Sequence, residues 1–247
     1  MSVGGGMLDG MDRYTERLPD PAARGLLTCV WSRRVASPAA GVARIVPDAC
    51  VDVVWYRETG ELFVAGPDTR PHVAEMVPGE VVGARFRTGR SPAGLGVPAD
   101  ALRDERVDLG ELWEPGRARR LADALAGTGS IGDAQAVLTR GVLDGVRSDP
   151  DTAVPRLLEL ARGGGRVTAM ADAVGLTERQ LHRRCLAAFG YGAKVLQRVL
   201  RFDTALRLAR GGSGFADVAY RTGYADQAHL AREVRSLAGV PLTKLVR

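Results

Sequence analysis

An internal repeat in the last third of the chain constrains the fold more than any other feature. The segments Ala171-Asp-Ala-Val-Gly175-Leu and Ala219-Tyr-Arg-Thr-Gly223-Tyr align at an offset of 48 residues. In each copy a polar stretch follows, and after it come a leucine, an arginine two positions later and a closing glycine. These residues are Leu181, Arg183 and Gly190 in the first copy, and Leu230, Arg232 and Gly239 in the second. A repeat of this length indicates a duplicated supersecondary unit.

Each copy has the residue types that a helix-turn-helix requires. Ala171 and Ala219 are small enough for two helices to cross closely, and Gly175 and Gly223 tolerate the positive φ of a tight turn. Apolar residues that would hold the second helix in place then follow: Leu176, Leu181 and Cys185 in the first copy, and Tyr224, Leu230 and Val234 in the second. Thr177 can cap the first recognition helix, and Asp226 lies near the start of the second, where the helix dipole favours its charge.

The outward positions of the two second helices carry side chains that can hydrogen-bond base edges in the major groove. They are Arg179, Gln180, His182 and Arg183 in the first copy, and Gln227, His229 and Arg232, with Ala228, in the second. A pair of amphipathic hairpins with solvated polar faces would explain one such pattern equally well. Two tandem copies favour DNA binding.

Charge is distributed unevenly along the chain, whose net charge is +5. Residues 151–247 carry 16 basic and 8 acidic side chains, a net charge of +8, whereas the preceding part carries 18 and 21, a net charge of −3. A basic C-terminal part on a mildly acidic partner is typical of a polyanion-binding module joined to a sensor. An ordinary solvated arginine-rich surface would give the same balance.

The closing segment, FADVAYRTGYADQAHLAREVRSLAGVPLTKLVR, contains Ala-x-x-x-Gly-Tyr, His-Leu-x-Arg and a Gly-Val followed by Pro. On these motifs the stretch 166–247 resembles the AraC/XylS family of transcription regulators. The resemblance implies two helix-turn-helix units joined by a long helix at 193–210, with recognition helices in successive major-groove segments about one turn apart. Carried onto matching positions, it implies base contacts by Arg179, His182, Arg183, Gln227, His229 and Arg232. Our candidates for contacts with the DNA backbone are Arg198 and Arg201 on the linking helix, together with Thr177 at a helix N-terminus.

The chain departs from the family pattern at two kinds of position. Cys185 and Val234 stand where the family buries an aromatic side chain, and Tyr191-Gly192 stands where Ser-Pro is usual. The smaller side chains predict a softer core with unchanged patterning. Cys185 is therefore expected to be a buried space-filling residue.

Residues 13–115 have the pattern of a β-rich domain, in which short β-branched or aromatic runs alternate with turn formers. From 117 to 146, apolar residues at helical spacing predict a helical pair. We therefore expect a two-domain α+β fold. A disordered start at 1–12 would precede a barrel- or sandwich-like domain at 13–148, and an all-α DNA-binding domain would occupy 151–247.

The stretch 14–115 also resembles the poorly characterised N-terminal domain of a subset of AraC-type regulators. That resemblance implies a sensor or dimerisation domain with a cupin-like barrel, but no ligand. Asp48, Cys50 and Asp52 alternate, so they would share one face of a strand. A ligand or metal cluster and an ordinary turn before a strand both explain this pattern. Single candidates are His72, without metal-ligand neighbours, and Arg85 and Arg87, which flank Phe86 and could meet an anion.

The remaining sequence features point to a cytoplasmic protein without catalytic chemistry. The three cysteines, Cys29, Cys50 and Cys185, are far apart in sequence, as in a reducing compartment. No catalytic, cofactor or metal motif, signal peptide or membrane-length apolar run is found. The bias toward arginine, alanine and glycine suggests a GC-rich bacterial genome.

We therefore expect a bacterial regulator of double-stranded DNA with no cofactor. Three further partners stay open: a small-molecule effector, a second copy of the chain bound through residues 117–146, and RNA polymerase. The alternative is a DNA-repair alkyltransferase-like enzyme fused to a DNA-targeting module, with Cys29 or Cys50 as nucleophile.

Overall fold

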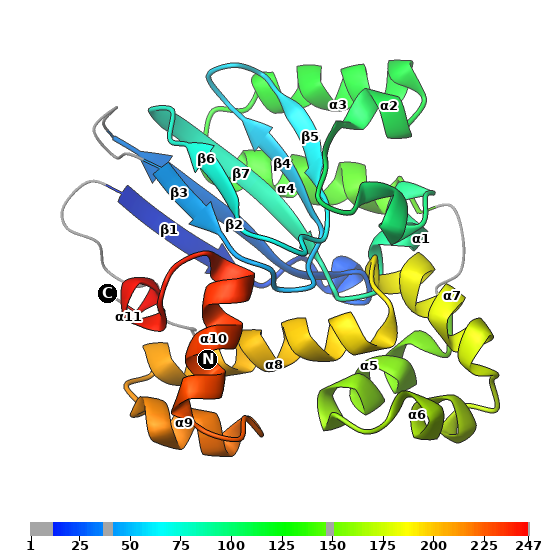
Figure 1. Ribbon diagram of the computed structural model, residues 1–247. Coiled ribbons are helices and arrows are strands. Elements are labelled where there is room, and N and C mark those ends of the chain that lie inside the picture. The colour runs from blue at the N-terminus through cyan, green and yellow to red at the C-terminus, as the bar shows by residue number, and fades with distance from the viewer. Residues whose placement is uncertain (1–11, 37–41, 147–150, 247) are drawn as a thin grey trace.

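The N-terminal part is built on two antiparallel sheets (Figure 1). The computed structural model describes residues 12–36, 42–146 and 151–246. Residues 1–11 of the expected disordered start, and the boundary between the two expected domains at 148–150, lie outside the described residues. The larger sheet has the order β1-β2-β7-β4-β5-β8, with bounds Asp12–Arg17, Leu27–Val35, Gly79–Phe86, Asp52–Tyr56, Leu62–Ala65 and Arg106–Asp108. The smaller sheet pairs β3 (Val42–Ile45) with β6 (His72–Glu75).

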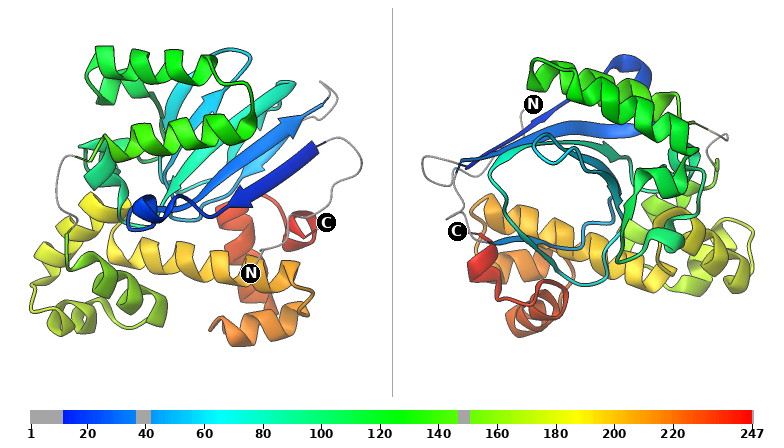
Figure 2. Two further views of the ribbon diagram at one scale, coloured as in Figure 1. Left: turned by 180° about the vertical axis from the view of Figure 1, so that it is seen from behind. Right: turned by 90° about the horizontal axis from the view of Figure 1, so that it is seen from above.

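The larger sheet has two covered faces, because successive side chains of a strand point to opposite sides. Val53, Trp55, Val82, Ala84 and Phe86 are buried in one core on the outer face. Helices α3 (Pro115–Ala126) and α4 (Ile131–Leu143) supply the other side of this core, and they are the helical pair expected between 117 and 146. The opposite face curves around a pocket that the smaller sheet closes on one side (Figure 2).

Short helical segments connect these elements near the boundary with the C-terminal part. They are η1 (Pro21–Ala23), α1 (Ser91–Leu95), η3 (Ala99–Leu102) and α2 (Leu109–Leu112). Both α1 and η3 lie against α7 of the C-terminal part.

The C-terminal part is entirely helical where the structure describes it. Its helices are α5 (Val154–Gly163), α6 (Val167–Ala173), α7 (Glu178–Phe189), α8 (Ala193–Arg210), α9 (Phe215–Arg221), α10 (Gln227–Ala238) and α11 (Leu242–Leu245). The first half of α8 is buried with α5–α7, and its second half is buried with α9–α11. One helix therefore belongs to two small cores, which is the expected arrangement of two units joined by a long helix.

The expected fold class, a β-rich N-terminal part followed by a helical C-terminal part, is confirmed. Among the described helices, none combines the length and the hydropathy needed to cross a lipid bilayer.

Candidate DNA interface and an internal pocket

The first helix-turn-helix consists of α6, a turn at Gly175 and α7. Gly175 has φ +67°, a conformation that costs a residue with a Cβ but not glycine. Ala171 is buried at the helix crossing, and Leu181 and Cys185 are fully buried on the inner face of α7. The predicted roles of these residues are confirmed.

Both recognition helices begin at a side-chain cap. The Thr177 hydroxyl accepts a hydrogen bond from the Gln180 backbone N–H at 3.2 Å, and the Gln180 Oε1 accepts one from the Thr177 N–H at 2.9 Å. This reciprocal capping box satisfies two N–H groups that the helix leaves unpaired. Asp226 caps α10 by accepting from the His229 N–H at 2.6 Å.

The second unit differs from the first in the length of its turn. The helices α6 and α9 begin 48 residues apart, whereas α7 and α10 begin 49 residues apart. The additional residue is Ala225, between Tyr224 and the cap Asp226, and its N–H donates to His229 Nδ1 at 3.3 Å. His229 is therefore half-buried, with its ring edge-on to Tyr224 at 5.2 Å.

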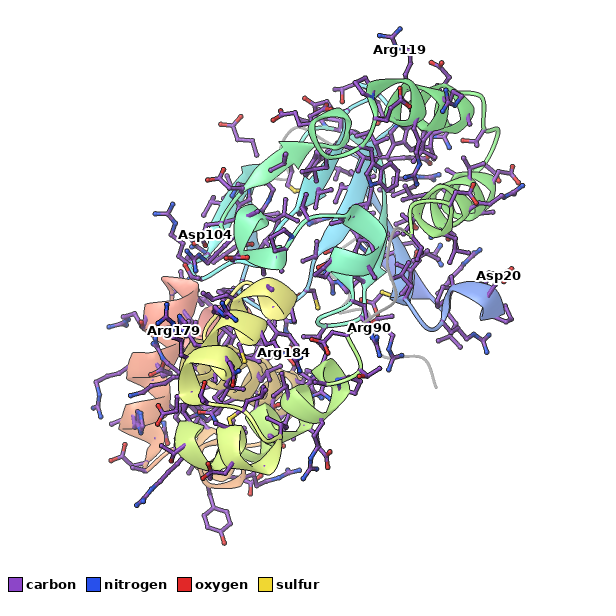
Figure 3. The ribbon with its side chains drawn as sticks, turned by 90° about the vertical axis from the view of Figure 1, so that its right-hand side faces the viewer. Asp20, Arg90, Asp104, Arg119, Arg179 and Arg184 are labelled. Atoms are coloured by element: carbon purple, nitrogen blue, oxygen red, sulfur yellow. The ribbon has the colours of Figure 1, made fainter. Side chains whose placement is uncertain are left out.

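The predicted base-reading residues fall into two groups. Arg179, Arg183, Gln227 and Arg232 are exposed and form no hydrogen bond or ion pair with other described residues (Figure 3 labels Arg179). His182 is also exposed and forms no hydrogen bond or ion pair with other described residues. Two side chains already accept hydrogen bonds within the protein: Gln180 through its carbonyl in the capping box, and His229 through Nδ1. All of them stay predictions as base readers.

The two arginines predicted to contact phosphates, Arg198 and Arg201, form contacts within the domain, and their phosphate contacts stay a prediction. Arg198 Nε donates to Glu233 Oε1 at 2.6 Å, which joins α8 to α10. The Arg201 guanidinium lies over the Tyr224 ring at 5.1 Å from its centroid. The first contact holds the second recognition helix against the linking helix, and the second contact holds the turn that precedes it.

The N-terminal part contacts the C-terminal end of each recognition helix. Arg103 Nη1 donates to the Gly190 carbonyl at 3.3 Å, just after α7, and Arg44 Nη1 donates to the Ala238 carbonyl at 3.3 Å, at the end of α10. Figure 1 shows the first turns of α7 and α10 pointing away from the sheets. The capped ends, which carry Arg179 and Gln227, are therefore on the side of the molecule opposite the β-rich part.

The N-terminal sheets enclose a pocket of about 510 Å³. Its wall consists of the strand positions that alternate with the core positions, including Val54, Tyr56 and Arg85. The predicted sharing of one face by Asp48, Cys50 and Asp52 is confirmed for the pocket wall, although only Asp52 belongs to β4.

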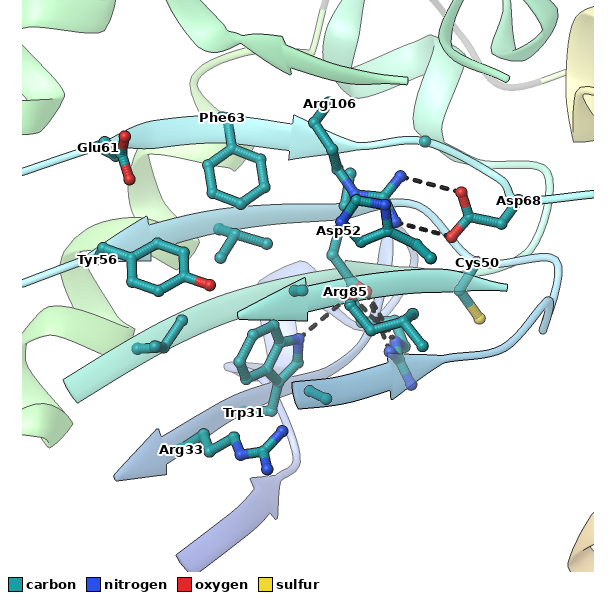
Figure 4. Close-up of a pocket in the computed structure, with 18 of the residues that line it drawn as sticks. Trp31, Arg33, Cys50, Asp52, Tyr56, Glu61, Phe63, Asp68, Arg85 and Arg106 are labelled. Carbon is teal, nitrogen blue, oxygen red and sulfur yellow. Dashed lines mark hydrogen bonds and ion pairs between the residues drawn. The ribbon is translucent and has the colours of Figure 1, made fainter. Parts of the chain in front are cut away.

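One end of the pocket is polar and contains two partly buried ion pairs (Figure 4). Arg85 donates to both Asp52 oxygens, with Nε–Oδ1 and Nη2–Oδ2 at 3.0 Å each, and its Nη2 lies 3.6 Å from Asp48 Oδ2. Arg106 donates to both oxygens of Asp68, at 3.0 and 2.8 Å. Burial raises the pKa of Asp48, and the neighbouring Asp52 carboxylate raises it further, against the opposing effect of Arg85. Arg85 keeps its charge, because the two carboxylates raise its pKa although burial lowers it.

The other end of the pocket is aromatic. Tyr56 and Phe63 stack with ring centroids 5.9 Å apart, and Trp31 lies 5.9 Å from Tyr14. Trp31 rests on Gly83, where a Cβ would come within 2.1 Å of the indole, and its Nε1 donates to Asp52 at 3.2 Å. Sequence reasoning missed these residues and the Arg106–Asp68 pair, and the only available signal was the alternation of polar and apolar positions in the strands.

No described residues form a group of three or more His, Cys, Asp or Glu side chains that could hold a metal ion. His72 lines the polar end, where burial lowers its pKa and Arg106 lowers it further. Burial also raises the pKa of every thiol, to about 12 at Cys29, to about 11 at Cys185 and well above the ordinary value at Cys50. A lowered pKa activates a cysteine as a nucleophile, and burial has the opposite effect on all three thiols.

Comparisons with known proteins agree with the helix-turn-helix geometry. Residues 170–247 match the family described as a helix-turn-helix domain, and residues 15–108 match a domain of unknown function (DUF6597). No curated protein matches the chain.

Several solved structures of ToxT from Vibrio cholerae align with the fold. A 1.65 Å structure shares 9% identity with a TM-score of 0.47, covering 96% of this chain and 98% of that one. The structure from strain O395 shares 10% identity with a TM-score of 0.45, covering 83% and 95%. A ToxT structure bound to an unsaturated fatty acid, from strain SCE256, shares 9% identity with a TM-score of 0.47, covering 83% and 93%. The matched C-terminal region is a helix-turn-helix domain of the AraC type, which is a DNA-binding domain of transcription regulators.

Proposed function

We propose that this regulator reads two successive major-groove segments with α7 and α10, while its N-terminal part fixes the relative position of the two units and binds a small-molecule effector. The linking helix α8 has 18 residues. At ~1.5 Å per residue it spans about 27 Å, which is close to the ~34 Å advance of one turn of DNA. This length supports readout of neighbouring groove segments on one side of the duplex.

The contact of the N-terminal part with both recognition helices is the observation that carries the proposal. Arg103 holds the end of α7 and Arg44 holds the end of α10, both through helix C-terminal carbonyls. These contacts leave the first turns of both helices unobstructed by the β-rich part (Figure 1). A change in the N-terminal sheets would therefore alter the relation between the two reading helices.

The pocket wall continues into both contact points, which supports an effector role. Arg44 lies on β3 between Ala43 and Ile45, and these two neighbours line the pocket. Ala49, at φ +61°, is buried in the core of the first DNA-binding unit, whereas the residues on either side of it line the pocket. A ligand in the pocket would touch the same segments that hold the DNA-binding units.

The test is selection of bound sequences from random duplex DNA with the full chain, repeated at two salt concentrations. We expect a motif with two conserved segments about one helical turn apart. Binding that depends on salt but enriches no motif would contradict base readout and leave only the electrostatic attraction of the basic domain.

The domain limits inferred from the sequence, 13–148 and 151–247, form part of this proposal, together with a cytoplasmic location and a role without catalysis. A homodimer is a further partner proposal, which light scattering of the full chain tests. Contact with RNA polymerase would follow if the protein activates transcription from the selected site.

A further inference from the structure

The charges around the pocket do not balance. Five carboxylates but only three arginines line it: Asp48, Asp52, Glu61, Asp68 and Asp108 against Arg33, Arg85 and Arg106. His72 adds no compensating charge at neutral pH, because burial and Arg106 lower its pKa. The pocket wall therefore carries two more carboxyl groups than arginines, within a protein whose overall charge is positive.

The excess of carboxyl groups over arginines is clearest at Arg85, a single arginine that lies beside the two carboxyl groups of Asp48 and Asp52. Asp52 takes both of its hydrogen bonds, and Asp48 lies 3.6 Å from the same guanidinium nitrogen. Arg106 is engaged in the same way by Asp68. An incoming anion would have to displace a carboxylate from Arg85 or Arg106, whereas an incoming cation could approach Asp48, which shares Arg85 with Asp52.

The aromatic end offers a second feature that favours a cation. The Tyr14–Trp31 and Tyr56–Phe63 pairs line the pocket, and the negative face of an aromatic ring attracts a positive charge. The same rings provide apolar surface for the body of a ligand. A volume of about 510 Å³ lies within the range of small-molecule sites.

We propose that the pocket takes an organic cation, an amine with an apolar or aromatic body, whose head group lies against Asp48 and Asp52 and whose body lies between the aromatic pairs. This inference rests on the proposed effector role of the N-terminal part. The head group would then lie beside Ala49, the residue that packs into the first DNA-binding unit. Binding of the ligand in the pocket would therefore first affect the packing of Ala49 against the first DNA-binding unit.

Titration calorimetry of the full chain with three probes that share one body tests the proposal: 2-(1-naphthyl)ethylamine, 2-(1-naphthyl)ethanol and 3-(1-naphthyl)propanoate. We expect the amine to bind at least about tenfold more tightly than the alcohol or the carboxylate, a difference of ~1.4 kcal/mol. Asp48→Asn should reduce the affinity for the amine to that for the alcohol. Tyr56→Leu should weaken the amine more than the alcohol, because it removes a ring face.

The control is Asp123→Asn on the exposed face of α3, which makes the same charge change outside the pocket and should leave all three affinities unchanged. Carboxylate binding as tight as amine binding, or binding of none of the probes, would overturn the cation assignment. Either result leaves the proposed DNA readout standing if the unliganded chain still binds its selected site. Loss of that site binding would contradict the proposed function instead.

Discussion

The Tyr191 hydroxyl donates a hydrogen bond of 2.7 Å to the backbone carbonyl of Asp68, and this bond joins the turn between α7 and α8 to the pocket wall. Tyr191 is fully buried, and Asp68 holds Arg106 through its carboxylate. The residue that replaces the usual Ser-Pro of the family is thus the one that links the first DNA-binding unit to the polar end of the pocket.

Tyr191→Phe should destabilise the protein by about 1 kcal/mol, because the Asp68 carbonyl loses its donor while the ring keeps its packing. Urea denaturation of the full chain measures the change. Tyr220→Phe is the matched control, because Tyr220 is 85% exposed and its hydroxyl forms no hydrogen bond among the described residues. Equal stabilities of the two variants would show that the interdomain bond contributes nothing.

Tyr224→Phe should have the opposite effect to Tyr191→Phe. The Tyr224 hydroxyl is buried and has no hydrogen-bond partner among the described residues, so its removal relieves an uncompensated desolvation. We expect the free energy of unfolding to rise by up to about 1 kcal/mol in the same urea experiment. A loss of stability comparable to that of Tyr191→Phe would mean that the hydroxyl is satisfied.

Arg183→Ala and Arg232→Ala should each weaken binding to the selected DNA site by ~1–3 kcal/mol and relax the preference at one base pair. Both side chains are exposed on the recognition helices. Competition binding with single-base variants of the site measures the effect. Arg119→Ala removes the same charge from α3 (Figure 3), and it should bind as wild type does. Wild-type behaviour of both recognition-helix variants would refute their assignment as base readers.

Arg198 has two candidate roles, a contact with a DNA phosphate and a structural ion pair with Glu233, and a pair of measurements separates them. If the bond to Glu233 is its main role, a double-mutant cycle of Arg198→Ala and Glu233→Gln should give a coupling of roughly 0.5–1 kcal/mol in stability. The salt dependence of DNA binding should then stay unchanged. A salt-dependence slope reduced by about 1 would instead support the predicted phosphate contact of Arg198.

The buried thiols should react slowly with iodoacetamide in the native chain. Burial raises the pKa of Cys29 from 9.0 to about 12 and that of Cys185 to about 11, so little thiolate forms near neutral pH. Labelling should accelerate on unfolding in urea. Because the folded-state pKa values are raised, the stability they contribute is complete below pH ~9 and declines as pH rises through the folded values. Fast labelling of one native cysteine at neutral pH would reopen the alkyltransferase alternative.

The sequence determined the DNA-binding half in detail because a helix-turn-helix is a local structure. The turn glycine Gly175, the cap Thr177 and the buried Cys185 act through neighbours within one unit, and their roles follow from residue type and spacing. Even there, tertiary contacts changed the interpretation of single residues. Arg198 donates a hydrogen bond to Glu233. His229 accepts a hydrogen bond from the backbone N–H of Ala225, the additional residue in the turn of the second unit.

The pocket was decided by the tertiary structure. Arg85 meets Asp52 across 33 residues of sequence, and Arg106 meets Asp68 across 38. Which strands become neighbours, and in which register, depends on the whole sheet and not on any short pattern. The sequence therefore identified a β-rich domain and the alternation of Asp48, Cys50 and Asp52. The carboxylates lie near the arginines and the aromatic rings because distant strands pair in one particular register. A short stretch of sequence does not specify that register.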